Sequence, residues 1–310
     1  TGRIRFEAAD SGLERLGVIV ENRRLLAGLW AALEGSDVVV RTGAGVRALT
    51  ADAGGVRLAL DDGAVLEGAL VVGADGGRSR VRELAGIDAE TTDTGQSAVV
   101  TVVATERAHG RTAWQRFLST GPLAFLPLPD APDGRHRCSV VWSLDRARAE
   151  AVQGLADAAF AGELERAFEG RLGAITAVDR RVSFPLLQVH ARHYRAPGVV
   201  LVGDAAHVVH PLAGQGVNLG LRDAALLARE LERAAVAPAA GLLDVDLLAR
   251  YERARRGDNA LMLASLLGLK RLFGADDPRV RWLRNAGLRF TDRSATIKRR
   301  LMAHALGLAG

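Results

Sequence analysis

The sequence predicts a mixed α/β (α+β) fold. Two short apolar strands are each followed by a glycine-containing turn and a helix, at 69–86 and at 199–231. Short strands are also predicted within 38–72, with turns at 52–55 and 61–63, and further along at 97–104, 114–118, 123–128, 137–143 and 176–184, with a helix at 154–171. The pattern is helical from about residue 242, with Gly257, Gly274 and Pro278 as expected breaks. Strands that pass through a tight turn into a helix are typical of α/β proteins, which bind ligands beyond the carboxyl ends of their strands.

The downstream segment carries the most information. Val199 to Val202 is apolar on both faces, as expected of a central strand. Asp204 follows its carboxyl end, where a carboxylate can accept hydrogen bonds from sugar-type hydroxyl groups. Gly214 and Gly216 have no side chain, so the backbone can approach a flat ligand closely.

A helix is predicted from about Val217. Its apolar stripe is formed by Leu219, Ala224, Leu227 and Leu231. The helix would point its free N–H groups and the positive end of its dipole at the glycine loop. A negative charge that develops there would be stabilised.

The upstream segment, 69–86, has the same order of elements. An apolar strand meets Gly73-Ala74-Asp75-Gly76, and a short helix follows. Ser79 is the expected N-cap of this helix and Gly86 its expected end. Taken alone, the segment is also compatible with an ordinary strand-to-helix turn.

Together, the two segments resemble the DG and GD motifs of the FAD-dependent aromatic hydroxylases, the group A flavoprotein monooxygenases with the p-hydroxybenzoate hydroxylase fold. The resemblance implies that Asp204 binds the ribityl chain of FAD and that the loop 211–218 lies against the isoalloxazine ring. The DG motif, with Arg80 and Arg82 also at matching positions, implies contacts with both FAD and NAD(P)H. The implied cofactor-binding residues are Asp75, Gly76, Gly203, Asp204, Pro211, Gly214, Gln215, Gly216, Val217 and Asn218.

Two further cofactor candidates lie near the start of the chain. Asn22 and Arg23 stand at an expected helix start and are candidates for contact with FAD phosphate or flavin. The alternative is ordinary capping and surface charge.

Within the family, the chain is similar to the branch that hydroxylates ubiquinone precursors. The segments that carry this similarity are 17–22, 29–33, 121–128, 138–142 and 210–220 with Asp223, and the tail segments 283–288 and 304–308 are also similar. The resemblance therefore spans nearly the whole chain.

The resemblance implies the reaction. NAD(P)H reduces FAD, O2 adds to form a flavin C4a-hydroperoxide, and an oxygen atom passes to the ring of a polyprenylated phenol or quinol in ubiquinone biosynthesis. The only catalytic candidates are His210, which would touch substrate, and Pro211, which would shape the site beside the flavin. Phe125, Pro127 and Trp142 are candidates for the substrate pocket, although aromatic residues on strands more often belong to the core.

The same resemblance divides the chain. Residues 1–90, with the DG motif at 73–82, and 191–240, with the GD motif at 203–220, are expected to form a Rossmann-like FAD/NAD(P)-binding domain. An antiparallel-sheet substrate domain, 91–190, is inserted between them, and 241–310 is the helical C-terminus. Family members open with a βαβ unit that carries G-x-G-x-x-G. The near match at 43–45 reads as a strand connection, so we expect this chain to be a fragment that lacks the N-terminal βαβ unit.

Composition excludes several other classes. The 310 residues include one cysteine, Cys138, which rules out a disulfide framework and favours a reducing, cytoplasmic compartment. The pI near 10.2 comes from scattered arginines without interleaved aromatic residues, so nucleic-acid binding is not expected. His207 and His210 have no third ligand at a recognisable spacing, and no metal is expected.

The tail 296–308 allows two interpretations. Ile297, Leu301, Ala305 and Leu308 form a stripe beside Lys298, Arg299 and Arg300. Such a helix can lie on the inner face of a membrane, which suits a lipid-like substrate or a biosynthetic complex, or it can dock on the core. Docking is the preferred interpretation.

Two other hypotheses remain for the function. The chain can be a different enzyme on the same scaffold, namely another aromatic hydroxylase, an epoxidase or a reductase. It can also be a non-catalytic partner or fragment, which the absent phosphate-binding turn favours.

Overall fold

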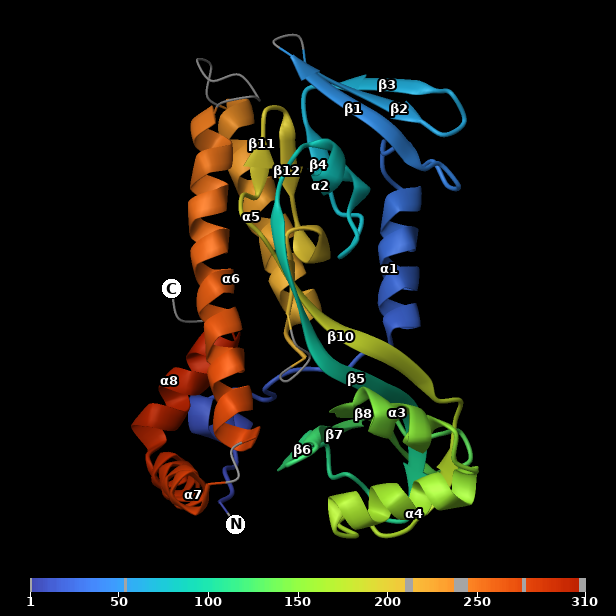
Figure 1. Ribbon diagram of the computed structural model, residues 1–310, viewed down its shortest axis with the longest axis vertical. Coiled ribbons are helices and arrows are strands. Elements are labelled where there is room, and N and C mark those ends of the chain that lie inside the picture. Colours follow the sequence, from blue (N-terminus) through green and yellow to red (C-terminus); the bar gives the residue numbers. More distant parts are fainter. Residues whose placement is uncertain (1, 53–54, 210–213, 237–244, 275–276, 307–310) are drawn as a thin grey trace. The chain divides into compact units, whose positions relative to one another are not determined.

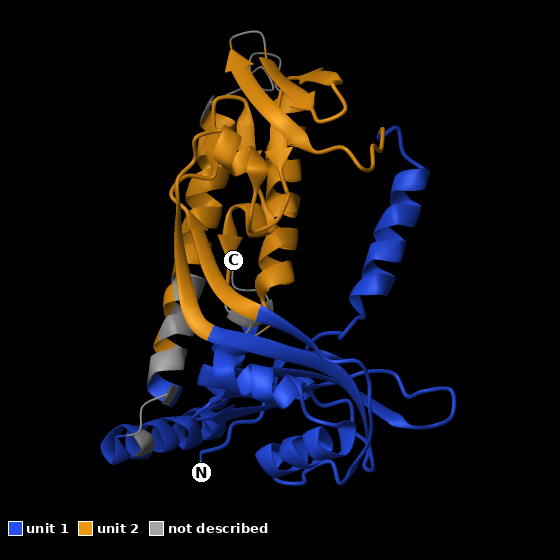
Figure 2. Cartoon of the chain, turned by 45° about the vertical axis from the view of Figure 1, so that its right-hand side comes forward, with its two compact units in different colours: residues 1–38, 96–184, 269–310 blue, residues 39–95, 185–268 orange. Residues whose placement is uncertain are grey.

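The structure, a computed structural model, describes residues 2–52, 55–209, 214–236, 245–274 and 277–306 (Figure 1). Two compact units can be distinguished (Figure 2). Unit 1 comprises 1–38, 96–184 and 269–310, and unit 2 comprises 39–95 and 185–268. Each unit thus combines segments that are far apart in the sequence.

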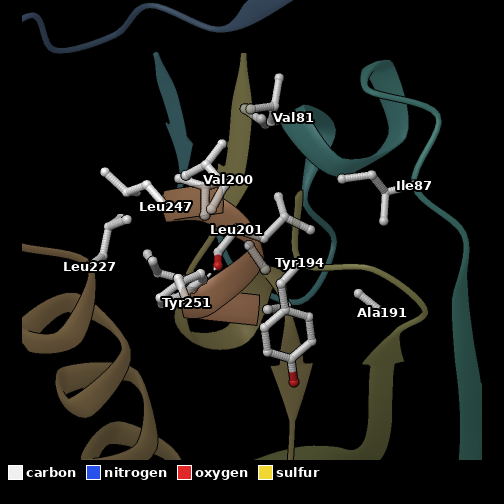
Figure 3. Close-up of a cluster of buried hydrophobic side chains, with 14 of the residues drawn as sticks. Val81, Ile87, Ala191, Tyr194, Val200, Leu201, Leu227, Leu247 and Tyr251 are labelled. Carbon is white, nitrogen blue, oxygen red and sulfur yellow. Dashed lines mark hydrogen bonds between the residues drawn. The ribbon is translucent and has the colours of Figure 1, made fainter. Parts of the chain in front are cut away.

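The centre of unit 2 is a small sheet with the strand order β11-β12-β4. Strand β12 (Val199–Leu201) pairs antiparallel with β11 (Arg195–Ala196) and parallel with β4 (Val71–Gly73). All three residues of β12 are fully buried, which explains their uniformly apolar character. Their neighbours in the core include Leu227, Leu247 and Tyr251 (Figure 3).

Three helices belong wholly or mainly to unit 2. They are α2 (Arg80–Leu84), α5 (Gly216–Val236) and α6 (Val245–Gly274). Gly257 lies inside α6, so the predicted interruption there is wrong. A 30-residue helix tolerates an exposed glycine such as Gly257 because the loss of about 1 kcal/mol per glycine is small beside its packing. The predicted breaks at Gly274 and Pro278 are confirmed by the end of α6 and the start of α7.

A second sheet of unit 2 is an antiparallel meander. Its strands are β1 (Val46–Asp52), β2 (Gly55–Leu60) and β3 (Val65–Gly68). The predicted turn at 61–63 is confirmed: Gly63 has a φ of 84°, and the Asp62 carboxylate accepts the amide of Ala64 at 2.9 Å. Val38 to Val40 form no strand, contrary to the prediction, and Val39 is 86% exposed.

Unit 1 contains most of the larger sheet, whose order is β13-β10-β5-β8-β7-β6 with β9 paired to β5. Its strands are β5 (Ala89–Thr105), β6 (Trp114–Leu118), β7 (Gly121–Pro127), β8 (His136–Asp145) and β9 (Ile175–Val178). Strands β10 (Val182–Ala191) and β13 (His207–Val208) pair with each other within unit 2. The strand-rich middle region predicted from the sequence is therefore confirmed.

Helices α3 (Arg146–Gln153) and α4 (Asp157–Phe168) cover one face of this sheet in unit 1. The helix predicted from Gly154 to Arg171 is confirmed by α4, which begins and ends three residues inside these bounds, whereas α3 is not predicted. Gly154 closes α3, and Glu169 ends α4 in the left-handed conformation with a φ of 59°. Phe160, Leu164 and Phe168 of α4 complete the core beneath the strands.

The remaining elements of unit 1 are η1 (Ala8–Ser11), α1 (Asn22–Glu34), α7 (Pro278–Arg293) and α8 (Ala295–Leu306). Helix α8 docks on η1: Lys298 Nζ lies 2.9 Å from the Asp10 carboxylate, and Met302 is buried. The buried residue is Met302 rather than Leu301, which is 48% exposed. Leu308 of the predicted stripe lies outside the described residues.

Candidate cofactor site

The two motif segments meet at one edge of the small sheet in unit 2. In the parallel register Val199 pairs with Val71 and Leu201 with Gly73, and the Val202 amide donates to the Gly73 carbonyl at 3.0 Å. Both strands therefore end side by side. The turns that follow them carry Asp75 and Asp204, at the edge where α/β proteins bind ligands.

Asp204 lies on a one-turn helix, η2 (Gly203–Ala205), that follows β12. Gly203 has a φ of 60°, which a side chain would disfavour. The Asp204 side chain reaches solvent and accepts no hydrogen bond from the part of the chain that the structure describes. Desolvation by the surrounding protein raises the pKa of Asp204 above its ordinary value, and the nearby His207 imidazole opposes this shift. The carboxylate is thus free to accept hydrogen bonds from a ligand.

Helix α5 begins at Gly216, close to the predicted start. The Leu219 amide donates to the Gln215 carbonyl at 2.9 Å, so the amides of Gly216, Val217 and Asn218 form the open first turn. Val217 and Asn218 are exposed, and the buried side-chain oxygen of Gln215 has no hydrogen-bond partner among the described residues. The amides of the first helical turn and this acceptor are groups that a large polar ligand can bind.

Part of the predicted loop is not described. His210 and Pro211 lie outside the described residues. Gly214, which follows them, has a φ of 60° and is exposed.

The DG segment is held mainly by its own hydrogen bonds. The Asp75 carboxylate accepts from Ser79 Oγ at 2.5 Å and from the amides of Arg80 and Val81 at 2.7 and 3.0 Å. Ser79 in turn accepts the Arg82 amide at 2.9 Å, which confirms it as the N-cap of α2. Burial raises the pKa of Asp75, but these hydrogen bonds outweigh that effect and leave the pKa below its ordinary value.

Arg82 joins the two motif segments. Its guanidinium donates to the Ala205 carbonyl at 2.8 Å and to the Gly77 carbonyl at 2.9 Å. Arg80, by contrast, forms an exposed pair with Glu83 at 2.7 Å. Gly76, with a φ of 83°, supplies the sharp turn between strand and helix. Arg82 thus fixes the GD turn against the DG turn.

The structure also reveals a buried charged network that the sequence reasoning missed. Asp223 of α5 bonds to Gly203, His207 and Arg255, and all four residues lie in unit 2. In the sequence, Asp223 is marked only by the family resemblance, and Arg255 is one of many scattered arginines. Because Asp223 is spaced four residues from both Leu219 and Leu227, its burial could have been inferred from helical periodicity.

The apolar stripe predicted for α5 is partly wrong. Leu219 and Leu227 are buried as predicted, but Ala224 is exposed. Two acidic residues are also buried on this face of α5: Asp223 lies between Leu219 and Leu227, and Glu230 lies beyond Leu227. Because the prediction counted apolar residues alone, it placed Ala224 on the buried face of α5, where the structure has Asp223.

Asn22 and Arg23 stand at the start of α1, as predicted, but they belong to unit 1. The Arg23 guanidinium lies 3.1 Å from the Glu21 carboxylate, which also faces Arg24 and Arg137. Their contact with the cofactor stays a prediction.

The three predicted pocket residues share the face of the unit 1 sheet that α3 and α4 cover. Phe125 and Trp142 are 1% and 3% exposed, and Phe125 stacks on Phe168 of α4 at 4.1 Å. Pro127 pairs with Cys138, which lies on the same face. Phe125 and Trp142 thus act as packing residues, the alternative favoured from the sequence, and a role in lining a pocket stays a prediction.

Cys138 is also buried in this core. Burial raises the pKa of its thiol to about 11, so the nucleophilic thiolate is suppressed. No cluster of three or more metal-ligating side chains occurs among the described residues.

Comparison with known proteins places this geometry in a family. Residues 17–263 match the model described as "FAD binding domain". The chain belongs to this family, and the class defined by the fold and the site is that of the FAD-dependent monooxygenases. The predicted family, fold and cofactor, with NAD(P)H as the reductant typical of the class, are confirmed.

Two of the proteins that this chain is similar to are named as hydroxylases. The chain is 38% identical over 309 residues to 3-demethoxyubiquinol 3-hydroxylase of Escherichia coli, an alignment that covers 99% of this chain and 77% of that protein. It is 42% identical over 299 residues to the ubiquinone hydroxylase UbiL of Rhodospirillum rubrum, covering 94% and 67%. The solved p-nitrophenol 4-monooxygenase PnpA of Pseudomonas putida shares the fold, with a TM-score of 0.72 at 21% identity, over 93% of this chain and 72% of PnpA.

Proposed function

We propose that this chain acts on the aromatic ring of a prenylated phenol or quinol, a ubiquinone precursor, with FAD, NAD(P)H and O2. The observation that carries the proposal is the Asp204 carboxylate, which stands without a hydrogen-bond partner from the described residues where β4 and β12 end. The relatives, both named as hydroxylases of ubiquinone or its precursor, support the choice of substrate.

The described residues fit FAD. Asp204 would accept hydrogen bonds from the ribityl hydroxyl groups, and the open amides of Gly216, Val217 and Asn218 would face negative charge on the flavin. Gly203, Gly214 and Gln215 would shape the surface between them. When bound, FAD supplies the activation of O2, a reaction that protein side chains do not perform.

The remaining predicted site residues have secondary roles in the proposed site. Asp75 and Gly76 would set the turn that contacts FAD and NAD(P)H, while Asn22 and Arg23 would face a phosphate or the flavin. Pro211 would lie beside the flavin ring and His210 near the substrate. No residue is proposed as a nucleophile, because the reacting oxygen comes from O2.

The face of the unit 1 sheet opposite α3 and α4 suits an apolar substrate. Val141 pairs with Val100 on one side and with Ala124 on the other, and all three point away from the Trp142 face. All three side chains are half-buried, with none of α3 or α4 against them. We therefore propose Val100, Ala124 and Val141 as contacts of the substrate ring or its tail.

Among the residues that the structure describes, no helix combines the length and apolar content required to cross a bilayer. We propose instead that the protein works in the cytoplasm, in peripheral contact with the inner face of the membrane or with a biosynthetic complex. The exposed Leu301 of α8, beside Arg299 and Arg300, supports this contact. Unchanged liposome binding after deletion of 298–310 would reject a role for α8.

The proposal is tested by titrating the chain with FAD and following flavin fluorescence and the visible spectrum. Saturable binding that is lost in Asp204→Asn supports the cofactor site. NAD(P)H and O2 are then supplied with a prenylated phenol or with a soluble phenol, and product mass is measured. Oxygen insertion only into the soluble phenol would favour another aromatic hydroxylase, and absence of FAD binding would leave this chain a non-catalytic fragment.

A further inference from the structure

The turn that carries Asp204 is held at both ends by one buried atom. Asp223 Oδ2 accepts the Gly203 amide at 2.9 Å and His207 Nε2 at 2.5 Å. Gly203 directly precedes Asp204, and His207 ends the turn at the start of β13. Between these two anchored positions Asp204 projects to solvent.

We propose that Asp223 is a positioning residue for cofactor binding, which clamps the Gly203–His207 turn so that the Asp204 carboxylate is presented in one orientation. The inference rests on the proposed role of Asp204 toward FAD. It adds a residue that would not touch the cofactor and acts through Gly203 and His207.

The clamp is itself anchored by α6. Arg255 Nε donates to the second oxygen of Asp223 at 2.6 Å, and the side chains are 6% and 0% exposed. The other guanidinium nitrogens bond to Asp258 and Asn259, each at 3.0 Å. With these partners the Arg255 guanidinium, and through it the carboxylate, has little freedom to rotate.

The hydrogen bonds of Asp223 and the charge of Arg255 keep the Asp223 carboxylate ionised. Burial raises the pKa of Asp223, but its bonds with His207, Arg255 and the Gly203 amide outweigh burial, and the pKa lies below its ordinary value. An ionised carboxylate accepts all three hydrogen bonds, and such charge-assisted bonds are stronger than neutral ones. The positive charge of Arg255 balances it, so no unpaired charge is buried.

Helix α5 offers a matched control. Glu230 is a second buried carboxylate, 4% exposed, and it also pairs with two arginines, Arg233 at 2.7 Å and Arg250 at 2.9 Å. Neither arginine belongs to the Asp204 turn, and no described bond of Glu230 reaches it. A variant of Glu230 therefore disturbs a comparable ion pair in the same helix without releasing the turn.

The first experiment measures hydrogen–deuterium exchange of the peptide 199–208 without FAD, in wild type, Asp223→Asn, His207→Asn and Glu230→Gln. Both clamp variants are expected to exchange about tenfold faster in this peptide than wild type, because a charge-assisted hydrogen bond is lost. Glu230→Gln should leave this peptide unchanged. Equal exchange in all four proteins, or the same increase in Glu230→Gln, overturns the clamp.

His207→Asn keeps the inference testable if Asp223→Asn does not fold, because it removes one end of the clamp and leaves the Asp223–Arg255 pair intact. FAD titration is the second arm: about tenfold weaker binding is expected in both clamp variants and not in Glu230→Gln. Unchanged FAD affinity in a clamp variant with faster exchange would overturn the positioning role. If wild type binds no FAD, the proposed function fails for this chain, and the exchange experiment alone decides whether the clamp exists.

Discussion

Gly220 of helix α5 lies directly against Gly203 of the Asp204 turn. A Cβ atom built on Gly220 would stand 3.2 Å from the Gly203 Cα, and the neighbouring atom is backbone rather than a mobile side chain. The close approach brings α5 onto the turn and explains the glycine at 220, whereas the φ of 60° explains the glycine at 203.

Gly220→Ala should therefore destabilise the protein and weaken FAD binding. Overpacking costs about 1–3 kcal/mol, which exceeds the gain of about 1 kcal/mol from replacing a helical glycine by alanine. Gly257→Ala in α6 is the control, because a Cβ there meets nothing within 4 Å and only the gain remains. Denaturant unfolding measures both, and a more stable Gly220→Ala would contradict the contact.

Asp204→Asn should lose FAD affinity by about tenfold or more while the protein gains stability at pH 7. The pKa of Asp204 is higher in the folded state than in the unfolded state, so the folded state binds the proton more tightly. Above both pKa values the ionised carboxylate therefore lowers the stability of the folded state. Removing the charge removes that penalty. Thermal unfolding at pH 7 and pH 3 checks the sign: the advantage of the variant should shrink at the lower pH. A variant less stable than wild type at pH 7 would refute this account.

Asp75 should show the opposite pH dependence. Its folded-state pKa is lowered, so its stabilising effect is complete above the unfolded pKa and is lost as pH falls through the folded one. Compared with wild type, Asp75→Asn should thus be less stable at pH 7 and nearly equal in strong acid. Unfolding curves across this range, with Asp62→Asn as an exposed control, test the prediction, and a pH-independent difference would speak against it.

Ser79→Ala should cost about 1 kcal/mol, since it removes the N-cap of α2 and one hydrogen bond to Asp75. Ser79→Thr keeps the capping oxygen and should lose less. The free energy of unfolding in urea measures the difference. Equal losses in the two variants would show that packing, rather than capping, determines the effect.

Local features of the site could be predicted because their causes are local. The uninterrupted apolar run of β12, the Ser79 cap and the glycine at the start of α5 each act within a few residues. The burial of Asp223 agrees with its spacing to Leu219 and Leu227, but its ion pair with Arg255 could not be assigned from that segment, since Arg255 lies on a different helix. Helix α3 is not predicted because only two of its eight residues, Ala149 and Val152, are buried, so it has hardly any apolar periodicity.

The sequence pattern also did not predict which face of the sheet each strand residue occupies. Phe125 and Trp142 are aromatic residues on the strands of the expected substrate domain, and only strand register shows that they face α3 and α4. One position along the strand, Ala124 and Val141 lie on the face opposite α3 and α4. Small and aliphatic residues give no signal for a binding surface in a single sequence.

Cys138 offers a practical consequence of the unit 1 core. It is the single cysteine of the chain, it is fully buried, and its thiolate is suppressed. A maleimide or disulfide reagent can therefore modify it only when this core opens. The rate of thiol labelling becomes a native reporter of opening events in unit 1, independent of the flavin signal, and needs no engineered probe.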